Sequence, residues 1–164
     1  MRVDFALPIA MVNQIEQVLS ELHRMTEAEC VLLADITGQL ISLQGQVEKS
    51  DPVLLAALAA GDVAAMSELS RRIGETDSSG TFLHEGKNKC IYTFNVGGSF
   101  ILIVIFRSET PVGMVRLFAS RAAEKFEVMI EKFESHVHPP PDDAPAADFE
   151  AALSDELEKA FGQA

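Results

Sequence analysis

The sequence predicts an α+β fold in which helices pack on the faces of one five-stranded antiparallel sheet. Three observations predict it: apolar residues at helical spacing in three long segments, apolar runs of strand length in five shorter ones, and glycine turns between neighbouring strands. The predicted order is αββαβββα, followed by a C-terminal segment. At 164 residues, the chain has the length of one domain with an appendage.

The first third of the chain predicts a helix followed by a hairpin. Residues 9–26 carry apolar side chains at helical spacing, so they predict the first helix. Residues 30–36 are almost wholly apolar, as in a strand that is covered on both faces. Thr37-Gly38 predicts a turn, and residues 39–44 alternate enough to form the second strand of the hairpin.

The second helix is expected to begin at Asp51-Pro52 and to run to about Ile73. Asp51 offers an N-cap oxygen, Pro52 needs no N–H in the first turn, and Gly74 suits the C-terminal stop. The larger apolar stripe of this helix is expected to pack on the sheet: Leu55, Leu58, Met66, Leu69 and Ile73.

A second stripe on this helix consists mostly of small residues: Ala57, Ala60, Gly61, Ala64 and Glu68. Small side chains let another backbone approach closely, so we interpret this stripe as a surface for another subunit or a partner. Gly61 supports this interpretation, because a glycine in the middle of a helix lowers its stability by about 0.5–1 kcal/mol relative to alanine and so indicates a packing reason. The alternative is that the alanines are present only because alanine is the best helix former.

Three strands and a long helix complete the predicted domain. Residues 81–85 form a short, sparse strand that is expected at an edge of the sheet, and residues 89–96 form the next strand. Gly97-Gly98 predicts a two-residue hairpin turn into residues 99–106, which are apolar on both faces and therefore expected at the centre. Residues 111–135 carry the apolar periodicity of the final helix.

The C-terminal segment is predicted to bind a protein rather than to join the core. We divide the chain into a domain (1–135), a proline-rich acidic linker (136–147) and an amphipathic interaction helix (148–164). Four large apolar residues recur every four positions in that helix: Phe149, Leu153, Leu157 and Phe161. From residue 142 onward, seven carboxylates and one lysine give a net charge of about −6, half of the −12 of the whole chain. The alternative is a terminal helix that docks on its own domain.

The acidic composition argues against nucleic acids and anionic membrane surfaces as partners. A pI near 4.6 leaves no basic footprint for either ligand. No unbroken apolar run approaches the ~20 residues that a membrane-spanning helix needs, and the N-terminus lacks the pattern of a secretion signal. We therefore expect a cytoplasmic protein without membrane insertion. Cys30 and Cys90 are interpreted as buried reduced thiols, with a disulfide as the alternative.

The sequence contains little that indicates catalysis. Phosphate-binding loops, zinc-protease helices and serine-hydrolase elbows are not found as motifs. His84 and Glu85 adjoin in a predicted strand, so their side chains point to opposite faces. His136 and His138 form only a weak His-x-His pair in the linker. The arginines at 71, 72, 107 and 116 are scattered, and any of them could form ordinary surface ion pairs. No catalytic residue, cofactor site or metal site is expected.

Five segments together resemble the Roadblock superfamily and, within it, the bacterial MglB-like polarity proteins. They are residues 31–42, 60–66, 84–86, 104–106 and 111–117. The Phe/Leu tail after a proline-rich linker fits the same family, so the resemblance covers nearly the whole chain. It implies a homodimer joined through the third strand, with the second helices side by side.

The resemblance also implies a function. MglB-like proteins bind a small Ras-like GTPase of the MglA type and stimulate its GTP hydrolysis without an arginine finger, by reshaping the active site of the GTPase. The second helix would then face the GTPase, and the C-terminal helix would contact it at a second place. The setting implied is bacterial cell polarity or motility, with the protein concentrated at a cell pole. The alternatives are a non-catalytic Roadblock-type scaffold for a GTPase or motor, and a small-molecule sensor domain.

Overall fold

The computed structural model describes residues 7–75 and 80–137, with side chains up to residue 135. The chain divides into two units, residues 1–129 and 130–164, and the described part of the second unit is the end of the last helix. The predicted interaction helix (148–164) and most of the predicted linker lie outside the described residues.

The observed elements follow the predicted order αββαβββα. They are α1 (Ile9–Thr26), β1 (Cys30–Asp35), β2 (Leu40–Gly45), α2 (Pro52–Arg72), β3 (Thr81–Glu85), β4 (Lys89–Val96), β5 (Phe100–Arg107) and α3 (Val112–Val137). The predicted fold class is confirmed, and most boundaries fall within two residues of the predicted ones.

All strand pairs in the sheet are antiparallel, and the strand order is β2-β1-β5-β4-β3. The predicted central position of the apolar strand is confirmed, since β5 lies in the middle with every residue from Phe100 to Phe106 buried. The predicted edge position of β3 is also confirmed. Within the described residues, β3 pairs with β4 alone, so the backbone groups along its outer edge have no strand partner.

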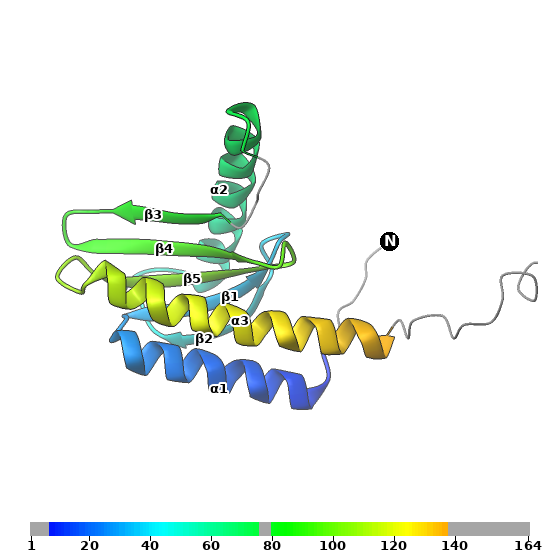
Figure 1. The fold of residues 1–164 in the computed structure, drawn as a ribbon. Helices are drawn as coiled ribbons and strands as arrows, with labels where there is room; N and C mark the ends of the chain where they lie inside the picture. The colour runs from blue at the N-terminus through cyan, green and yellow to red at the C-terminus, as the bar shows by residue number, and fades with distance from the viewer. Residues whose placement is uncertain (1–6, 76–79, 138–164) are drawn as a thin grey trace, which may run out of the picture. The chain divides into compact units, whose positions relative to one another are not determined.

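The helices cover the two faces of the sheet unequally (Figure 1). Alternate strand residues, such as Leu32 and Ile103, pack with Ala60 and Val63 of α2. The residues between them in β1 and β5 are equally buried, so the other face is covered by α1 and α3. Over residues 112–129, α3 lies beside α1, and Glu21 of α1 accepts a 2.7 Å hydrogen bond from Lys125 of α3.

Local chemistry explains where α2 begins and ends. The Asp51 carboxylate accepts a 2.9 Å hydrogen bond from the Val53 N–H, and Pro52 occupies the first turn, as predicted. At the other end, Gly74 has a φ of +88°, and its N–H donates to the carbonyl of Arg71.

The predicted packing of the larger apolar stripe of α2 was wrong for three of its five residues. Leu58, Leu69 and Ile73 are 62%, 58% and 73% exposed, whereas Leu55 and Met66 are half-buried. The buried side chains of α2 are small: Ala56, Ala60 and Val63.

The reason is the close approach of the β1–β2 turn to α2. A Cβ atom built on Gly38 would lie 2.9 Å from the Cα of Ala57 and 3.2 Å from the Cβ of Ala60. Large side chains do not fit between surfaces this close, so the helix turns its small residues toward the sheet and its leucines outward.

The two cysteines are free and buried, which confirms the interpretation as reduced thiols. Cys30 pairs with Ile105 and Cys90 with Phe106, which are neighbours in β5, so the two side chains point to opposite faces of the sheet. Burial also raises the pKa of the Cys30 thiol, which keeps it protonated and unreactive at neutral pH.

Candidate functional site

The exposed surface of α2 is the most unusual feature of the described residues. Large apolar side chains lie exposed along its length: Val53, Leu54, Leu58, Leu69 and Ile73. At 3.6 residues per turn, Leu54, Leu58 and Leu69 lie opposite the buried Ala56, Ala60 and Val63, and we call these three leucines the outer apolar stripe. Scattered exposed leucines are normal, whereas several gathered on one helix mark a contact surface.

The apolar composition of α2 is also that of a membrane-spanning helix. Among the described residues, it is the one helix that is long and apolar enough to cross a bilayer. A helix that packs on a sheet passes the same test, and Ala56, Ala60 and Val63 do pack on this sheet. With Asp62 also exposed at its middle, we interpret α2 as a helix of the domain with a second face left for another protein.

Four of the five small-stripe residues lie together on one exposed flank of α2, next to the outer apolar stripe. They are Ala57, Gly61, Ala64 and Glu68, which we call the small-residue flank. Ala60 differs, because it is only 7% exposed and packs on the sheet. A Cβ atom on Gly61 would meet nothing within 4 Å, so this glycine has no packing reason among the described residues.

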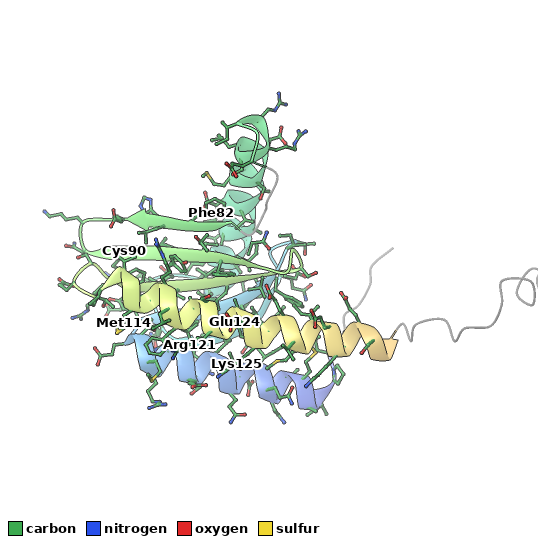
Figure 2. The ribbon with its side chains drawn as sticks, viewed as in Figure 1. Phe82, Cys90, Met114, Arg121, Glu124 and Lys125 are labelled. Carbon is green, nitrogen blue, oxygen red and sulfur yellow. The ribbon has the colours of Figure 1, made fainter. Side chains whose placement is uncertain are left out.

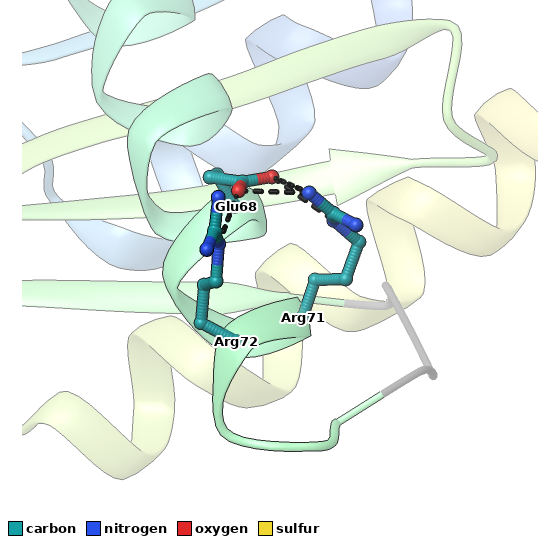
Figure 3. Close-up of polar contacts among 3 residues, drawn as sticks. All are labelled: Glu68, Arg71 and Arg72. Carbon is teal, nitrogen blue, oxygen red and sulfur yellow. Dashed lines mark hydrogen bonds and ion pairs between the residues drawn. The ribbon is translucent and has the colours of Figure 1, made fainter.

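At its C-terminal end, the flank becomes a charged cluster of Glu68, Arg71 and Arg72 (Figure 3). Arg71 donates to both carboxylate oxygens of Glu68 through Nη2, at 2.7 and 2.8 Å, and also through Nε at 3.0 Å. Arg72 donates through Nε to Glu68 Oε1 at 2.8 Å. All three side chains are exposed, and the hydrogen bonds from Arg72 and then Arg71 hold the pKa of the Glu68 carboxyl below its ordinary value.

Ordinary surface ion pairs were expected for these arginines, but the convergence of both on one carboxylate was not. The signal was present: on a helix, residues three and four positions after Glu68 lie next to it.

The free edge of β3 is a second exposed feature. Figure 2 shows Phe82 on this strand, and its half-buried side chain lies on the α2 face of the sheet. His84 and Glu85 are exposed and alternate across the strand, as predicted. An unpaired strand edge offers backbone donors and acceptors to another strand.

Other charged groups on the described surface form ordinary ion pairs. Glu29, just before β1, is bridged by Lys89 of β4 at 2.5 Å and approached by Arg107 of β5 at 3.7 Å. Arg121 of α3 lies 5.6 Å from the centre of the Phe118 ring. Within residues 7–75 and 80–137, no group of three or more His, Cys, Asp or Glu side chains could hold a metal ion.

Comparison with known proteins identifies the fold. The model of the Roadblock/LC7 domain matches residues 14–106. Among solved structures, MglB from Myxococcus xanthus is 35% identical, with a TM-score of 0.72 over 78% of this chain and 96% of that one. The gliding protein MglB from Thermus thermophilus is 27% identical, with a TM-score of 0.71 over 80% and 99%.

A third solved structure, an MglB with a tetrameric arrangement, is 27% identical with a TM-score of 0.73, over 80% of this chain and 98% of that one. A search of curated proteins gave no match. The family match spans more than half of the chain, from α1 through β5, and the similarity to the MglB structures extends beyond it. The chain therefore belongs to the Roadblock/LC7 family and is MglB-like within it.

Proposed function

We propose that this protein is a homodimeric GTPase-activating protein for a small Ras-like GTPase of the MglA type, in bacterial cell polarity or motility. The observation that carries the proposal is the 35% identity to MglB over nearly the full length of that chain. The exposed face of α2 supports it, because it provides a surface that the described residues leave uncovered. The protein contributes no catalytic group of its own and acts by remodelling the active site of the GTPase.

The proposed dimer uses the outer apolar stripe and the free edge of β3. Covering a leucine that is about 60% exposed removes apolar surface from water and contributes on the order of 1 kcal/mol for each side chain. A second copy brings the same residues to the interface, so the gain is doubled by symmetry. The β3 edge would add backbone hydrogen bonds between the two sheets.

The proposed GTPase contact is the small-residue flank. Ala57, Gly61 and Ala64 are exposed and short, so a partner backbone can approach α2 closely there. Ala60 supports this surface from below, because it is buried against the sheet.

The C-terminal helix is proposed to provide a second contact. Its anchors Phe149, Leu153, Leu157 and Phe161 would contribute about 6–10 kcal/mol gross when fully buried, against about 2–5 kcal/mol for ordering the segment. The free energy that remains corresponds to weak binding by the helix alone. The linker compensates for this low affinity, because it gives the helix an effective concentration in the millimolar range. A twelve-residue linker spans about 20 Å as a coil. In the cell we propose a cytoplasmic protein concentrated at a pole.

The test is single-turnover GTP hydrolysis by the Ras-like GTPase, alone and with this protein. We expect acceleration by the wild type and its loss with Ala64→Arg, because a long charged side chain would block close approach at the flank. The matched control is Ala10→Arg at an exposed position of α1, which is expected to accelerate hydrolysis like the wild type. Binding without acceleration by the wild type would replace the activator with a Roadblock-type scaffold.

The contribution of the C-terminal helix is tested separately with Phe149→Ala combined with Phe161→Ala. We expect a weaker complex with the GTPase and an unchanged melting temperature of the free protein. A large drop in the melting temperature would show instead that the segment docks on its own domain.

A further inference from the structure

The cluster of Glu68, Arg71 and Arg72 concentrates positive charge at one end of α2 in an acidic chain. The protein carries a net charge of −12, yet two guanidinium groups here surround one carboxylate. Two arginines have about ten N–H donors, whereas one carboxylate offers about four acceptor sites. The cluster therefore keeps positive charge and hydrogen-bond donors that Glu68 does not satisfy.

Helical spacing accounts for the pairing within the cluster, but the pairing adds little stability. Exposed pairs at these spacings stabilise a helix by only about 0.3–0.5 kcal/mol each. The helix dipole favours Arg71 and Arg72 in the last turn, but it gives no benefit to a carboxylate near the same end. Glu68 instead fixes the two guanidinium groups, since it receives hydrogen bonds from both.

The position of the cluster indicates what it would contact. On the helix, Arg71 and Arg72 lie on either side of the line that Ala57, Ala64 and Glu68 follow. A partner seated on the small residues would therefore meet the arginines at the C-terminal end of the same flank. Because guanidinium groups bind carboxylates with matching geometry, the partner surface at this end would be acidic.

We infer that Arg71 and Arg72, positioned by Glu68, bind carboxylates on the surface of the GTPase and fix the register in which it lies along α2, an inference that rests on the proposed function. Glu68 acts as a positioning residue. Because it carries the same charge as the partner carboxylates, it also weakens the contact that it organises. The two arginines contribute affinity and orientation, and they do not contact the nucleotide.

The test measures the affinity of the full-length protein for the GTPase at 50 and 300 mM salt. We expect Arg71→Ala with Arg72→Ala to weaken binding at least tenfold at low salt and to flatten the salt dependence. The matched control removes two exposed arginines of α3, Arg116→Ala with Arg121→Ala, and is expected to change affinity less than twofold. Equal affinity and equal salt dependence for the wild type and the Arg71/Arg72 variant would overturn the inference.

Two further readouts separate this role from others. Glu68→Gln keeps a carbonyl oxygen that can hold the two guanidinium groups and removes a like charge, so it is expected to bind the GTPase with equal or greater affinity; a loss as large as that of the arginine variant would overturn the inference. At saturating protein, the arginine variant is expected to reach the wild-type hydrolysis rate. A tenfold lower maximal rate with unchanged affinity would place the arginines at the nucleotide phosphates instead.

The same titration also tests the proposed function separately. If the wild type itself fails to bind the GTPase, the proposed function fails, and this is known before any variant is compared.

Discussion

The helices on the two faces of the sheet differ in the side chains that they bury and expose. On one face, α1 and α3 bury large side chains such as Leu19 and Phe126 and leave mostly polar residues outside. On the other face, α2 buries Ala56 and Ala60 and leaves leucines outside. In the described residues, the first arrangement leaves only scattered large apolar side chains exposed, such as Leu117 and Val128. The second leaves apolar surface uncovered, so we infer that α2 serves contacts with other chains, whereas α1 and α3 serve the stability of the fold.

The largest effect is expected on the face of the sheet that α1 and α3 cover. Leu19→Ala removes a fully buried side chain of α1 and is expected to lower the free energy of unfolding by about 2–5 kcal/mol, because it leaves a cavity. Chemical denaturation measures the change. Leu117→Ala on α3, where the leucine is 49% exposed, is the control and is expected to cost less than about 1 kcal/mol. Similar losses for the two variants would contradict the proposed division between core and surface.

The next prediction tests the uncovered face. Leu58→Ser with Leu69→Ser is expected to weaken self-association by about 100-fold, close to 3 kcal/mol, because both copies lose apolar contacts. Sedimentation velocity over a range of concentrations measures it. The matched control changes two exposed apolar residues of α3, Leu117→Ser with Val128→Ser, and is expected to leave association unchanged. Dissociation by the control pair alone would move the interface to the other face.

A third prediction addresses why α2 has small residues inside. Gly38→Ala is expected to lower the free energy of unfolding by about 2–4 kcal/mol, because it combines a φ of +92° with a collision against the backbone of Ala57. Gly98→Ala is the control: its φ is +73°, but a Cβ there would meet nothing within 4 Å, so only the cost of about 1 kcal/mol for the backbone conformation is expected. Chemical denaturation measures both variants. Equal losses of unfolding free energy would show that the close approach of Gly38 does not explain the small buried residues of α2.

The smallest expected effect concerns Gly61. Gly61→Ala is expected to raise the free energy of unfolding by about 0.5–1 kcal/mol, because alanine is the better helix former and the space beside Gly61 is open. Denaturation is followed at several protein concentrations. A loss of stability that grows with concentration would instead show that a second copy occupies this space.

Most of the fold was predictable from local signals. Apolar periodicity located the three helices, the Asp51-Pro52 pair fixed the start of α2, and Gly97-Gly98 placed the last hairpin. The central place of β5 followed from its continuous apolar run, since only a strand covered on both faces can bury every side chain.

The candidate site was predictable only in part. Ala57, Gly61, Ala64 and Glu68 are exposed together, as a contact surface requires, but Ala60 is buried beneath them. The clustering of Arg71 and Arg72 around Glu68 was missed. Helical spacing was enough to suggest it, whereas the choice of rotamers that brings both arginines to one carboxylate is visible only in the structure.

The sequence by itself determined which segments become helices and strands and in what order, because those choices depend on neighbours a few positions away. It did not determine which side of α2 meets the sheet. That helix has apolar residues around most of its circumference, so periodicity alone permits more than one orientation. The tertiary structure decided it through the β1–β2 turn, where Gly38 approaches so closely that only small side chains fit beneath the helix. The leucines that remain outside are the consequence, and they make α2 the surface on which other chains are expected to bind.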